Sequence, residues 1–328
     1  LSPVADQLLG RPYAGDPDNW DRLVSEVGWE AAVRQNARDR LELARLLGHD
    51  MLYAVPNPLP PGSLTAGEEH EPVQDDPVEA LRLRNQHARS QPALYEDCLL
   101  VYQLLHEEMN AMGLDLPILA PAYAHGVWTD VDLMQTMLLD PPTAHEHFAL
   151  ATQRAMASIE HYLDLDIDFI GVGGDFAGTR PIISPRAYRT FIVPEVRKCS
   201  RRIHEAGKYA VNASDGDLWT VIDDFLLGCE VDAYLEIDFF AGMDLGRLKA
   251  GYGDKVTLFG NLDCGNMLSF GSPAQIRQHT IDCLEAGMGS GGHILCASNA
   301  ITASISLENY LVMVNTYREF FALPPLKI

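Results

Sequence analysis

The chain has 328 residues, of which 47% are hydrophobic and 21% charged, a composition that supports a large buried core and excludes intrinsic disorder. Its formal net charge of −22 disfavours binding to nucleic acid or to an anionic membrane, because phosphate binding requires clustered Lys and Arg. No apolar run approaches the roughly 20 residues needed to cross a bilayer, and the first residues do not resemble a signal peptide, so we expect a cytoplasmic protein.

Residues 1–50 are predicted to form a helical extension. Asp18-Asn19-Trp20 can begin one helix, and residues 29–47 carry apolar side chains at helical spacing. Residues 57–76 are rich in Pro, Gly and Glu, which is typical of a long loop that acts as a lid. We therefore expect two parts, the extension at 1–50 and one larger domain at 51–328.

Two early strands are predicted, at residues 51–55 and 117–123. The second strand ends near Tyr123 and His125, which become candidates for substrate contact. For His125, a satisfied surface histidine is the open alternative. A helix follows at 131–139, and Asp140-Pro141-Pro142 begins another.

A short apolar segment that ends in acids or amides occurs five times between residues 168 and 299. The copies span 168–175, 208–215, 233–238, 256–263 and 293–299, with helix-length segments between them. Strands alternating with helices indicate a parallel sheet, and polar groups at every strand's carboxyl end indicate one shared site. The sequence therefore predicts an α/β fold, a (β/α)8 TIM barrel with an N-terminal helical extension. Seven strands are counted in this way, so the eighth lies in residues 1–20 or is absent from the chain.

Helix boundaries after these strands are marked by residues that favour starts and stops. Ser184-Pro185 begins a helix that we expect to run to Gly207. Ser272-Pro273 begins another that ends near Gly287. Pro194 should kink or divide the first of these helices, because proline lacks the backbone N–H that a helix interior needs.

Seven short motifs occur in a fixed order after residue 170. They are GDFAG at 174–178, PIISP at 181–185, FIVP at 191–194, SDGDLW at 214–219, AGMDL at 241–245, YGD at 252–254 and GNLD at 260–263. Their order and spacing resemble those of the uroporphyrinogen decarboxylase superfamily over roughly residues 110–320. More narrowly, the chain resembles the branch of that superfamily that contains corrinoid-dependent methyltransferases. The resemblance implies a (β/α)8 barrel, in agreement with the strand pattern.

The resemblance implies two alternative activities. True uroporphyrinogen decarboxylases carry an N-terminal arginine-rich motif that clamps the propionate groups of the tetrapyrrole, and we do not find it in this sequence. The early arginines are instead spaced as solvated helix positions, at Arg11, Arg22, Arg34, Arg38, Arg40 and Arg45. Acidic strand ends would also repel an octacarboxylate. We therefore rank methyl transfer between a corrinoid protein and a small molecule first, and decarboxylation second.

The methyltransferase branch commonly binds zinc through a His-x-Cys pair and a later Cys, and the zinc turns a thiol into a methyl acceptor. This sequence departs from that pattern, with Ala213, Asp215 and Asn299 at the three positions. We therefore expect no metal at them and no thiol acceptor activated there. A metal site built from Glu236, Asp238 and His125 is the alternative to plain hydrogen-bonding roles for these residues.

An acid and amide pocket remains as the predicted site. Asp175, Asp215 and Asp263 are the predicted catalytic residues, because crowded carboxylates raise the pKa of at least one of them and create a general acid. Asp175 precedes a loop that is too long for simple capping. The predicted substrate-binding residues are Tyr123, His125, Asn212, Trp219, Glu236, Asp238, Asn261 and Asn299. For about half of the strand-end acids and amides, the open alternative is that they cap the helices that follow. For Trp219, the open alternative is a hydrophobic lid over the barrel end.

The resemblance implies partners as well as chemistry. We expect a separate corrinoid protein to dock over the barrel mouth, because we recognise no cobalamin-binding module in this chain. Tetrahydrofolate or a methoxylated or methylated small molecule is the expected second substrate, and a homodimer is left open. A third hypothesis is a non-catalytic binding barrel, motivated by Ala213 and the missing cysteines.

Overall fold

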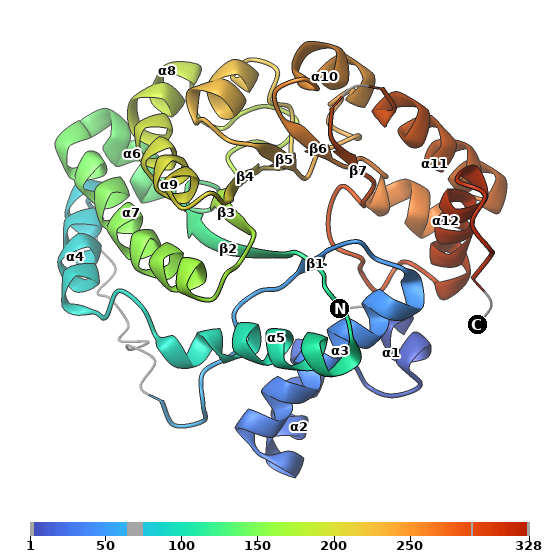
Figure 1. The fold of residues 1–328 in the computed structure, drawn as a ribbon. Helices are drawn as coiled ribbons and strands as arrows, with labels where there is room; N and C mark the ends of the chain where they lie inside the picture. The colour runs from blue at the N-terminus through green and yellow to red at the C-terminus, as the bar shows by residue number, and fades with distance from the viewer. Residues whose placement is uncertain (1–2, 64–74, 290, 327–328) are drawn as a thin grey trace. The chain divides into compact units, whose positions relative to one another are not determined.

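The computed structural model describes residues 3–63, 75–289 and 291–326 of the chain (Figure 1). Residues 64–74, most of the predicted lid loop, lie outside the described residues. Two compact units are present. The first comprises Leu1–Asn57, Cys98–Ile118 and Leu235–Ile328, and the second comprises Pro58–Asp97 and Leu119–Tyr234.

Three helices build the N-terminal part of the first unit, α1 (Pro3–Leu9), α2 (Pro17–Val27) and α3 (Trp29–Leu47). Helix α3 packs against α5 (Leu100–Met112), where Arg34 and Arg38 each place a guanidinium nitrogen 2.9 Å from the Glu108 carboxylate. The described residues 3–20 form α1, a connecting turn and the start of α2, with no strand among them, so the suggestion that an eighth strand lies in residues 1–20 is wrong for that stretch.

The strands follow one another in the sheet in the order of the chain. They are β1 (Leu52–Tyr53), β2 (Ile118–Ala124), β3 (Phe169–Gly173), β4 (Tyr209–Ala213), β5 (Ala233–Leu235), β6 (Thr257–Phe259) and β7 (His293–Ile294). Strand β3 pairs in parallel with β2 and with β4 in the second unit, and β6 pairs in parallel with β7 in the first. With helices between most consecutive strands, this is the TIM-barrel type of α/β fold that the sequence predicts (Figure 1).

The helices of the second unit cover its strands on the outside. They are α4 (Pro77–Ser90), α6 (Val131–Leu139), α7 (Pro141–Asp164), α8 (Pro185–Ala187) and α9 (Val193–Glu205), and α9 packs on β3 and β4 (Figure 1). The segment predicted as one helix from Ser184 to Gly207 is divided by a π-helical turn at Tyr188–Ile192. This turn directly precedes the first residues of α9, where Pro194 lies, so the predicted interruption is confirmed.

Stacked aromatic rings fill the core of the second unit. Phe176 stacks on Tyr188 with ring centroids 4.5 Å apart, and Phe225 meets Tyr234 edge to face at 4.9 Å. All four side chains are buried. Since Phe176 directly follows Asp175 in the chain, the packed ring fixes the backbone next to this acid.

The remaining helices of the first unit are α10 (Leu245–Tyr252), α11 (Pro273–Gly287) and α12 (Leu307–Phe320). Shorter turns lie at Glu96–Leu99, Asp224–Gly228 and Cys264–Leu268. One core cluster joins α1, α3, α11, α12 and the last of these turns through Val4, Leu47, Cys264, Leu268, Ile276, Ile305, Tyr310 and Val314. Burial of these side chains is the main force that holds the first unit together.

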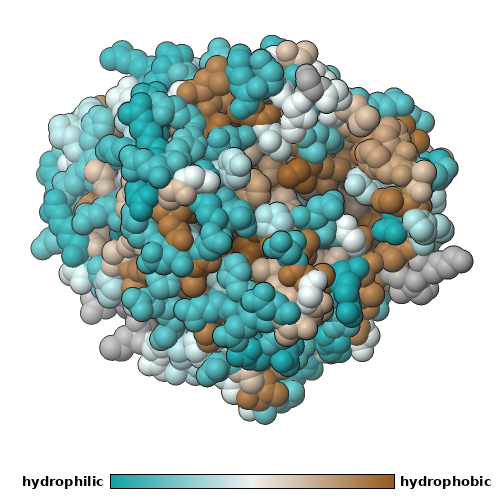
Figure 2. All heavy atoms as spheres, viewed as in Figure 1, coloured by the Kyte–Doolittle hydropathy of each residue, from teal (hydrophilic) through white to brown (hydrophobic). Residues whose placement is uncertain are grey.

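Hydrophilic side chains dominate over α4, α7 and α9 on the face that Figure 2 shows. This surface fits the formal net charge of −22. In the described part of the chain, no helix is both long and apolar enough to span a bilayer.

We predict that Ser272→Ala lowers the free energy of unfolding by about 1 kcal/mol. Ser272 and Gln275 form a capping box at the start of α11, in which each side chain bonds the other's backbone N–H. Urea denaturation measures the change. Ser272→Thr keeps the hydroxyl and serves as the matched control, and equal losses in both variants would contradict a capping role.

Candidate functional site

The carboxylate of Asp175 joins the ends of two neighbouring strands in the second unit. Its Oδ1 accepts a hydrogen bond of 2.9 Å from the backbone N–H of Asp215, which follows β4. The N–H of Gly174 donates to the Ala213 carbonyl oxygen at 3.0 Å, just before this contact. Asp175 therefore stabilises the adjacent β4 loop, and does not cap the helix that follows β3. Both acids stay half-buried.

The two loops beyond this contact pack backbone against backbone. Gly216 has a φ of 91°, and a Cβ on it would lie 2.5 Å from the Gly178 carbonyl oxygen. The N–H of Asp217 donates to that same oxygen at 2.8 Å. Only glycine combines this left-handed backbone with so close an approach. Close packing of the two loops therefore explains the glycine of the SDGD segment. The same packing places Asp217 beside the Asp175 loop.

His125 is buried at the end of β2, with 2% of its surface exposed. Its backbone N–H donates to Gly173 of β3 at 3.3 Å, and its Nδ1 accepts from the Val127 N–H at 3.4 Å. Burial lowers the pKa of the imidazole to about 4, and a hydrogen bond with the Gly174 backbone opposes the shift only in part. The open alternative of a surface histidine is wrong, and the ring is neutral at pH 7.

Tyr123 and Asn212 lie inside the second unit and not at its strand-end loops. Burial raises the pKa of the Tyr123 hydroxyl, and the neighbouring Cys199 of α9 adds to the shift. Asn212 is 1% exposed, and its Nδ2 donates to the Phe225 carbonyl oxygen at 3.1 Å. Both side chains are therefore packed in the interior of the second unit. Trp219 is half-buried, and its backbone N–H donates to Asp217 Oδ1 at 3.0 Å.

Asp263 and Asn261 follow β6 in the first unit, and both are buried. Asp263 Oδ1 accepts from the Asn266 N–H at 3.0 Å and so caps the π-helical turn that follows. The Asp263 N–H donates to Nε2 of His279 at 3.0 Å. Asn261 Nδ2 donates to the Met243 carbonyl oxygen at 3.0 Å. Asp263 therefore caps the turn that follows it, which was the open alternative to a catalytic role. Asn261 is held in the packed interior by its hydrogen bond to Met243.

Glu236 is a positive-φ residue at the end of β5, with a φ of 71°. This conformation is strained for a residue with a side chain and tends to occur at functional sites. The charge of Glu236 contributes, after burial, to raising the pKa of Tyr53 and to raising that of Cys296 to about 12. Glu236 therefore lies in the electrostatic surroundings of both side chains. Asp238 Oδ1 accepts from the Ala241 N–H at 3.0 Å, which is a local turn contact.

Of the three positions at which the family resemblance implies zinc ligands, two fit a metal poorly. Ala213 has no donor atom in its side chain, and its carbonyl oxygen accepts the Gly174 N–H. Asn299 is exposed and bonds the N–H of Ala300 at 2.6 Å. Within residues 3–63, 75–289 and 291–326, no three His, Cys, Asp or Glu side chains gather as a metal site. The alternative metal site from Glu236, Asp238 and His125 thus gains no support.

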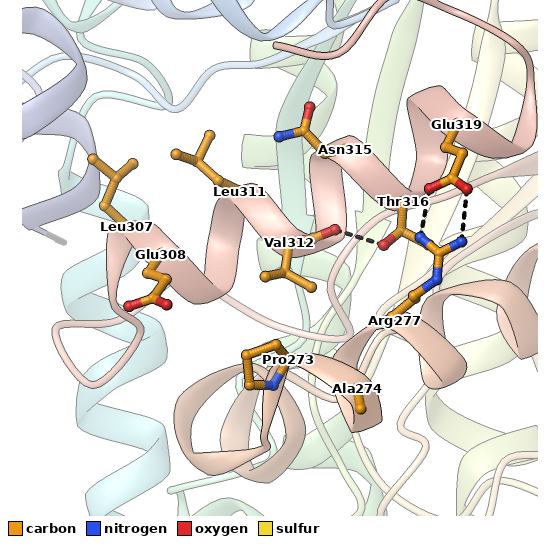
Figure 3. A pocket seen from close by; sticks show the side chains of 10 residues that line it. All are labelled: Pro273, Ala274, Arg277, Leu307, Glu308, Leu311, Val312, Asn315, Thr316 and Glu319. Carbon is orange, nitrogen blue, oxygen red and sulfur yellow. Dashed lines mark hydrogen bonds and ion pairs between the residues drawn. The ribbon is translucent and has the colours of Figure 1, made fainter. Parts of the chain in front are cut away.

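A groove of about 710 Å³ lies elsewhere in the first unit, between α11 and α12 (Figure 3). Leu307, Leu311 and Val312 line it, and the Arg277 guanidinium and Glu319 carboxylate pair at its edge with N to O distances of 2.6 and 2.8 Å. None of the predicted site residues lines this groove. The chemistry is therefore better sought at the strand-end loops.

Trp128 is a residue that the sequence reasoning missed. It lies in the loop between β2 and α6, and 47% of its surface is exposed. The available signal was its position three residues after His125, in the same strand-end loop. In the structure its ring lies beside Gly178 of the next loop, with Cη2 3.3 Å from the position that a Cβ on this glycine would take.

Comparison with known proteins gives a consistent family assignment. A family model described as uroporphyrinogen decarboxylase (URO-D) matches residues 67–320. A methyltransferase from Methanosarcina mazei has a similar structure, with a TM-score of 0.65 and 16% identity over 97% of this chain and 98% of that one. A D-psicose 3-epimerase from Clostridium cellulolyticum H10 aligns with a TM-score of 0.42 and 11% identity, over 91% and 94% of the two chains. None of the curated proteins matches the chain significantly. At 16% identity, the likeness to the Methanosarcina structure shows the fold alone.

We predict that Gly216→Ala destabilises the protein by about 3 kcal/mol, because a Cβ would meet the backbone of the Asp175 loop as well as strain φ. Gly242→Ala is the matched control, since Gly242 has a φ of 87° and open space around its Cβ position. The control should lose only about 1 kcal/mol. Equal losses in urea denaturation would show that the close loop contact contributes nothing.

We predict that His125 makes the protein less stable as the pH falls from about 6.5 to about 4. The unfolded state binds the proton at the ordinary pKa of 6.5, whereas the folded state resists it down to about 4. Unfolding is therefore favoured across this window, by up to about 3 kcal/mol. Between pH 6.5 and 4, the free energy of unfolding of His125→Gln should fall less than that of the unmodified chain, by up to about 3 kcal/mol. An unchanged pH dependence in the variant would contradict the neutral, buried histidine.

Proposed function

The chain belongs to the uroporphyrinogen decarboxylase (URO-D) family, and from this premise we propose that it is a methyltransferase. In this proposal it moves a methyl group between the corrinoid of a separate partner protein and a small molecule. The observation that carries the proposal is the Asp175 carboxylate, held between two strand-end loops by the Asp215 N–H. A fixed and half-buried acid at the carboxyl end of a barrel strand is well placed for proton transfer.

The early arginines argue against the decarboxylase alternative. In the first unit, Arg11 bonds Asp39 and Glu42, and Arg34 and Arg38 bond Glu108. These guanidinium groups pair with carboxylates of the same helical part and do not form a cationic clamp. An octacarboxylate needs such a clamp to offset its charge, and the loops around Asp175 add further negative charge.

Demethylation of an ether illustrates what the acid would contribute. The carbon–oxygen bond would break with its electron pair left on the oxygen, and a reduced corrinoid, when bound, would supply the electron pair that takes up the methyl group. The leaving oxygen then needs one proton. Asp175 in its protonated form would donate that proton, and the Asp215 N–H would stabilise the carboxylate that results.

The Asp215 side chain belongs to the same loop pair, together with Asp217. Of these acids, Asp175 is the one to which we assign the proton transfer, because the Asp215 N–H fixes its carboxylate. In the reverse direction the same carboxylate would accept a proton from a hydroxyl or amine that attacks the methyl group. One residue thus serves both directions of the reaction.

We predict that Asp175→Asn lowers the rate of methyl transfer by about 100-fold or more, the usual contribution of a general acid. Asparagine keeps an oxygen acceptor for the Asp215 N–H, so stability should change little. The assay follows methyl-cobalamin formation and consumption by absorbance, with free cobalamin in place of the partner protein. Asp244→Asn is the matched control, because Asp244 caps α10 outside the site and asparagine caps equally well.

The outcomes separate the three hypotheses. Full activity in Asp175→Asn would contradict its role as the acid. Release of carbon dioxide from uroporphyrinogen by the unmodified chain would favour the decarboxylase. Binding of corrinoid or pterin without any turnover, for a panel of methyl donors, would favour the non-catalytic barrel.

A further inference from the structure

Helix α6 turns an apolar face to solvent. The helix lies against α4 and α7 of its own unit (Figure 1), and Leu133, Thr136 and Met137 are its buried residues. Its outward face, at positions spaced three and four residues apart, carries Val131, Met134, Gln135, Leu138 and Leu139. The outward face of a surface helix normally carries charged and polar side chains. Here four of the five outward residues are apolar.

The apolar side chains on this face are highly exposed. Leu138 is 81% exposed, Leu139 68% and Val131 57%. Trp128, in the loop that precedes α6, is 47% exposed. We call these four side chains the α6 patch. Single exposed apolar residues are common, but several on one face of a short helix form a patch of roughly a few hundred Å², the size that marks an interaction site.

We propose that the α6 patch is the interface between two copies of this chain, related by a two-fold axis that passes near Gln135. Antiparallel pairing of α6 with its own copy sets Val131 against Leu139 of the other copy. The same symmetry sets Trp128 against the exposed Pro142 of the other copy. A two-fold interface has to be self-complementary, and an apolar face with large side chains toward both ends of one helix meets this condition.

The charges beside the α6 patch favour the same antiparallel arrangement. Asp132 lies at the start of α6, and its side chain is 45% exposed. Arg82 of α4 lies at the other end of α6, where it bonds Asp140 at 2.6 Å and remains 55% exposed. The two-fold pairing brings each Asp132 toward the Arg82 of the other copy, twice in one dimer. It also sets the N-terminus of each α6 beside the C-terminus of the other, which suits the helix dipoles.

The overall charge of the chain limits where two copies can meet. Copies with a net charge of −22 repel each other, so their contact requires a face with few acids, and the α6 patch is such a face. Its area is small beside that of an obligate dimer. We therefore expect a reversible dimer with a Kd on the order of 10 µM. This dimer does not depend on the proposed methyltransferase function.

Sedimentation velocity of the full chain, from about 1 to about 200 µM, measures the association. We expect Leu138→Glu to weaken it at least about 30-fold, because a carboxylate enters the interface from each copy. Asp132→Lys should weaken it about 5-fold, since it replaces two attractive pairs with Arg82 by repulsive ones. Leu227→Glu is the matched control, because it adds the same charge at an exposed leucine of the turn Asp224–Gly228 in the same unit. It should leave the affinity unchanged.

A cysteine cross-link tests the antiparallel register. Gln135 lies at the centre of α6, so the pairing brings both copies of this residue together at the axis. Oxidation of Gln135→Cys should therefore give a disulfide-linked dimer as the main product. Gln103→Cys, at an exposed glutamine in α5 of the first unit, is the matched control and should remain mostly monomeric. Urea denaturation checks that each variant keeps the stability of the unmodified chain.

Each result decides the proposal. A chain that stays monomeric to about 200 µM overturns it, and so does a dimer that Leu138→Glu does not weaken. Cross-linking of Gln135→Cys that is no greater than that of Gln103→Cys would overturn the antiparallel pairing. A chain that is monomeric alone, yet binds a corrinoid protein in a manner that Leu138→Glu abolishes, would overturn the second copy as the occupant in favour of that partner.

Discussion

The hydrogen bond from the Asp215 N–H to the Asp175 carboxylate is the contact on which the proposed site depends. It joins the loops that follow two neighbouring parallel strands, and the glycine contact next to it presses the loops together. Strand ends provide rigid anchors but their loops are free to move, so a charged bond between loops fixes the acid in place.

Around this contact, buried groups are kept neutral and the carboxylates stay partly exposed. His125 is fully enclosed and has a low pKa, so it contributes backbone and ring hydrogen bonds to the β2 and β3 ends and no charge. In the N-terminal helices of the first unit, arginines form ion pairs with carboxylates, as Arg34 does with Glu108. The loops after β3 and β4 thus carry the half-buried carboxylates of Asp175, Asp215 and Asp217.

The sequence was most informative where a local rule decides the structure. Ser272-Pro273 and Gly287 marked the ends of α11, and Pro194 marked an interrupted helix, because caps and proline act within one helical turn. The strands were also located, although all except β2 were predicted too long. Site roles were harder to predict. Asn261 and Asp263 follow β6, and Asn212 lies near the end of β4. The side chains of all three bond backbone groups of nearby segments, which a position near a strand end cannot reveal.

The sequence by itself determined the alternation of strands and helices, the family motifs and the acidic character of the strand ends. These properties are written in residue order, periodicity and charge. Only the tertiary structure decided that Asp175 bonds the Asp215 backbone, that His125 is buried and neutral, and that Trp128 lies beside Gly178. These contacts join residues that are 40 or more positions apart in the chain, and they depend on how parallel strands align. Register and packing are collective properties of the folded chain, so no local pattern encodes them.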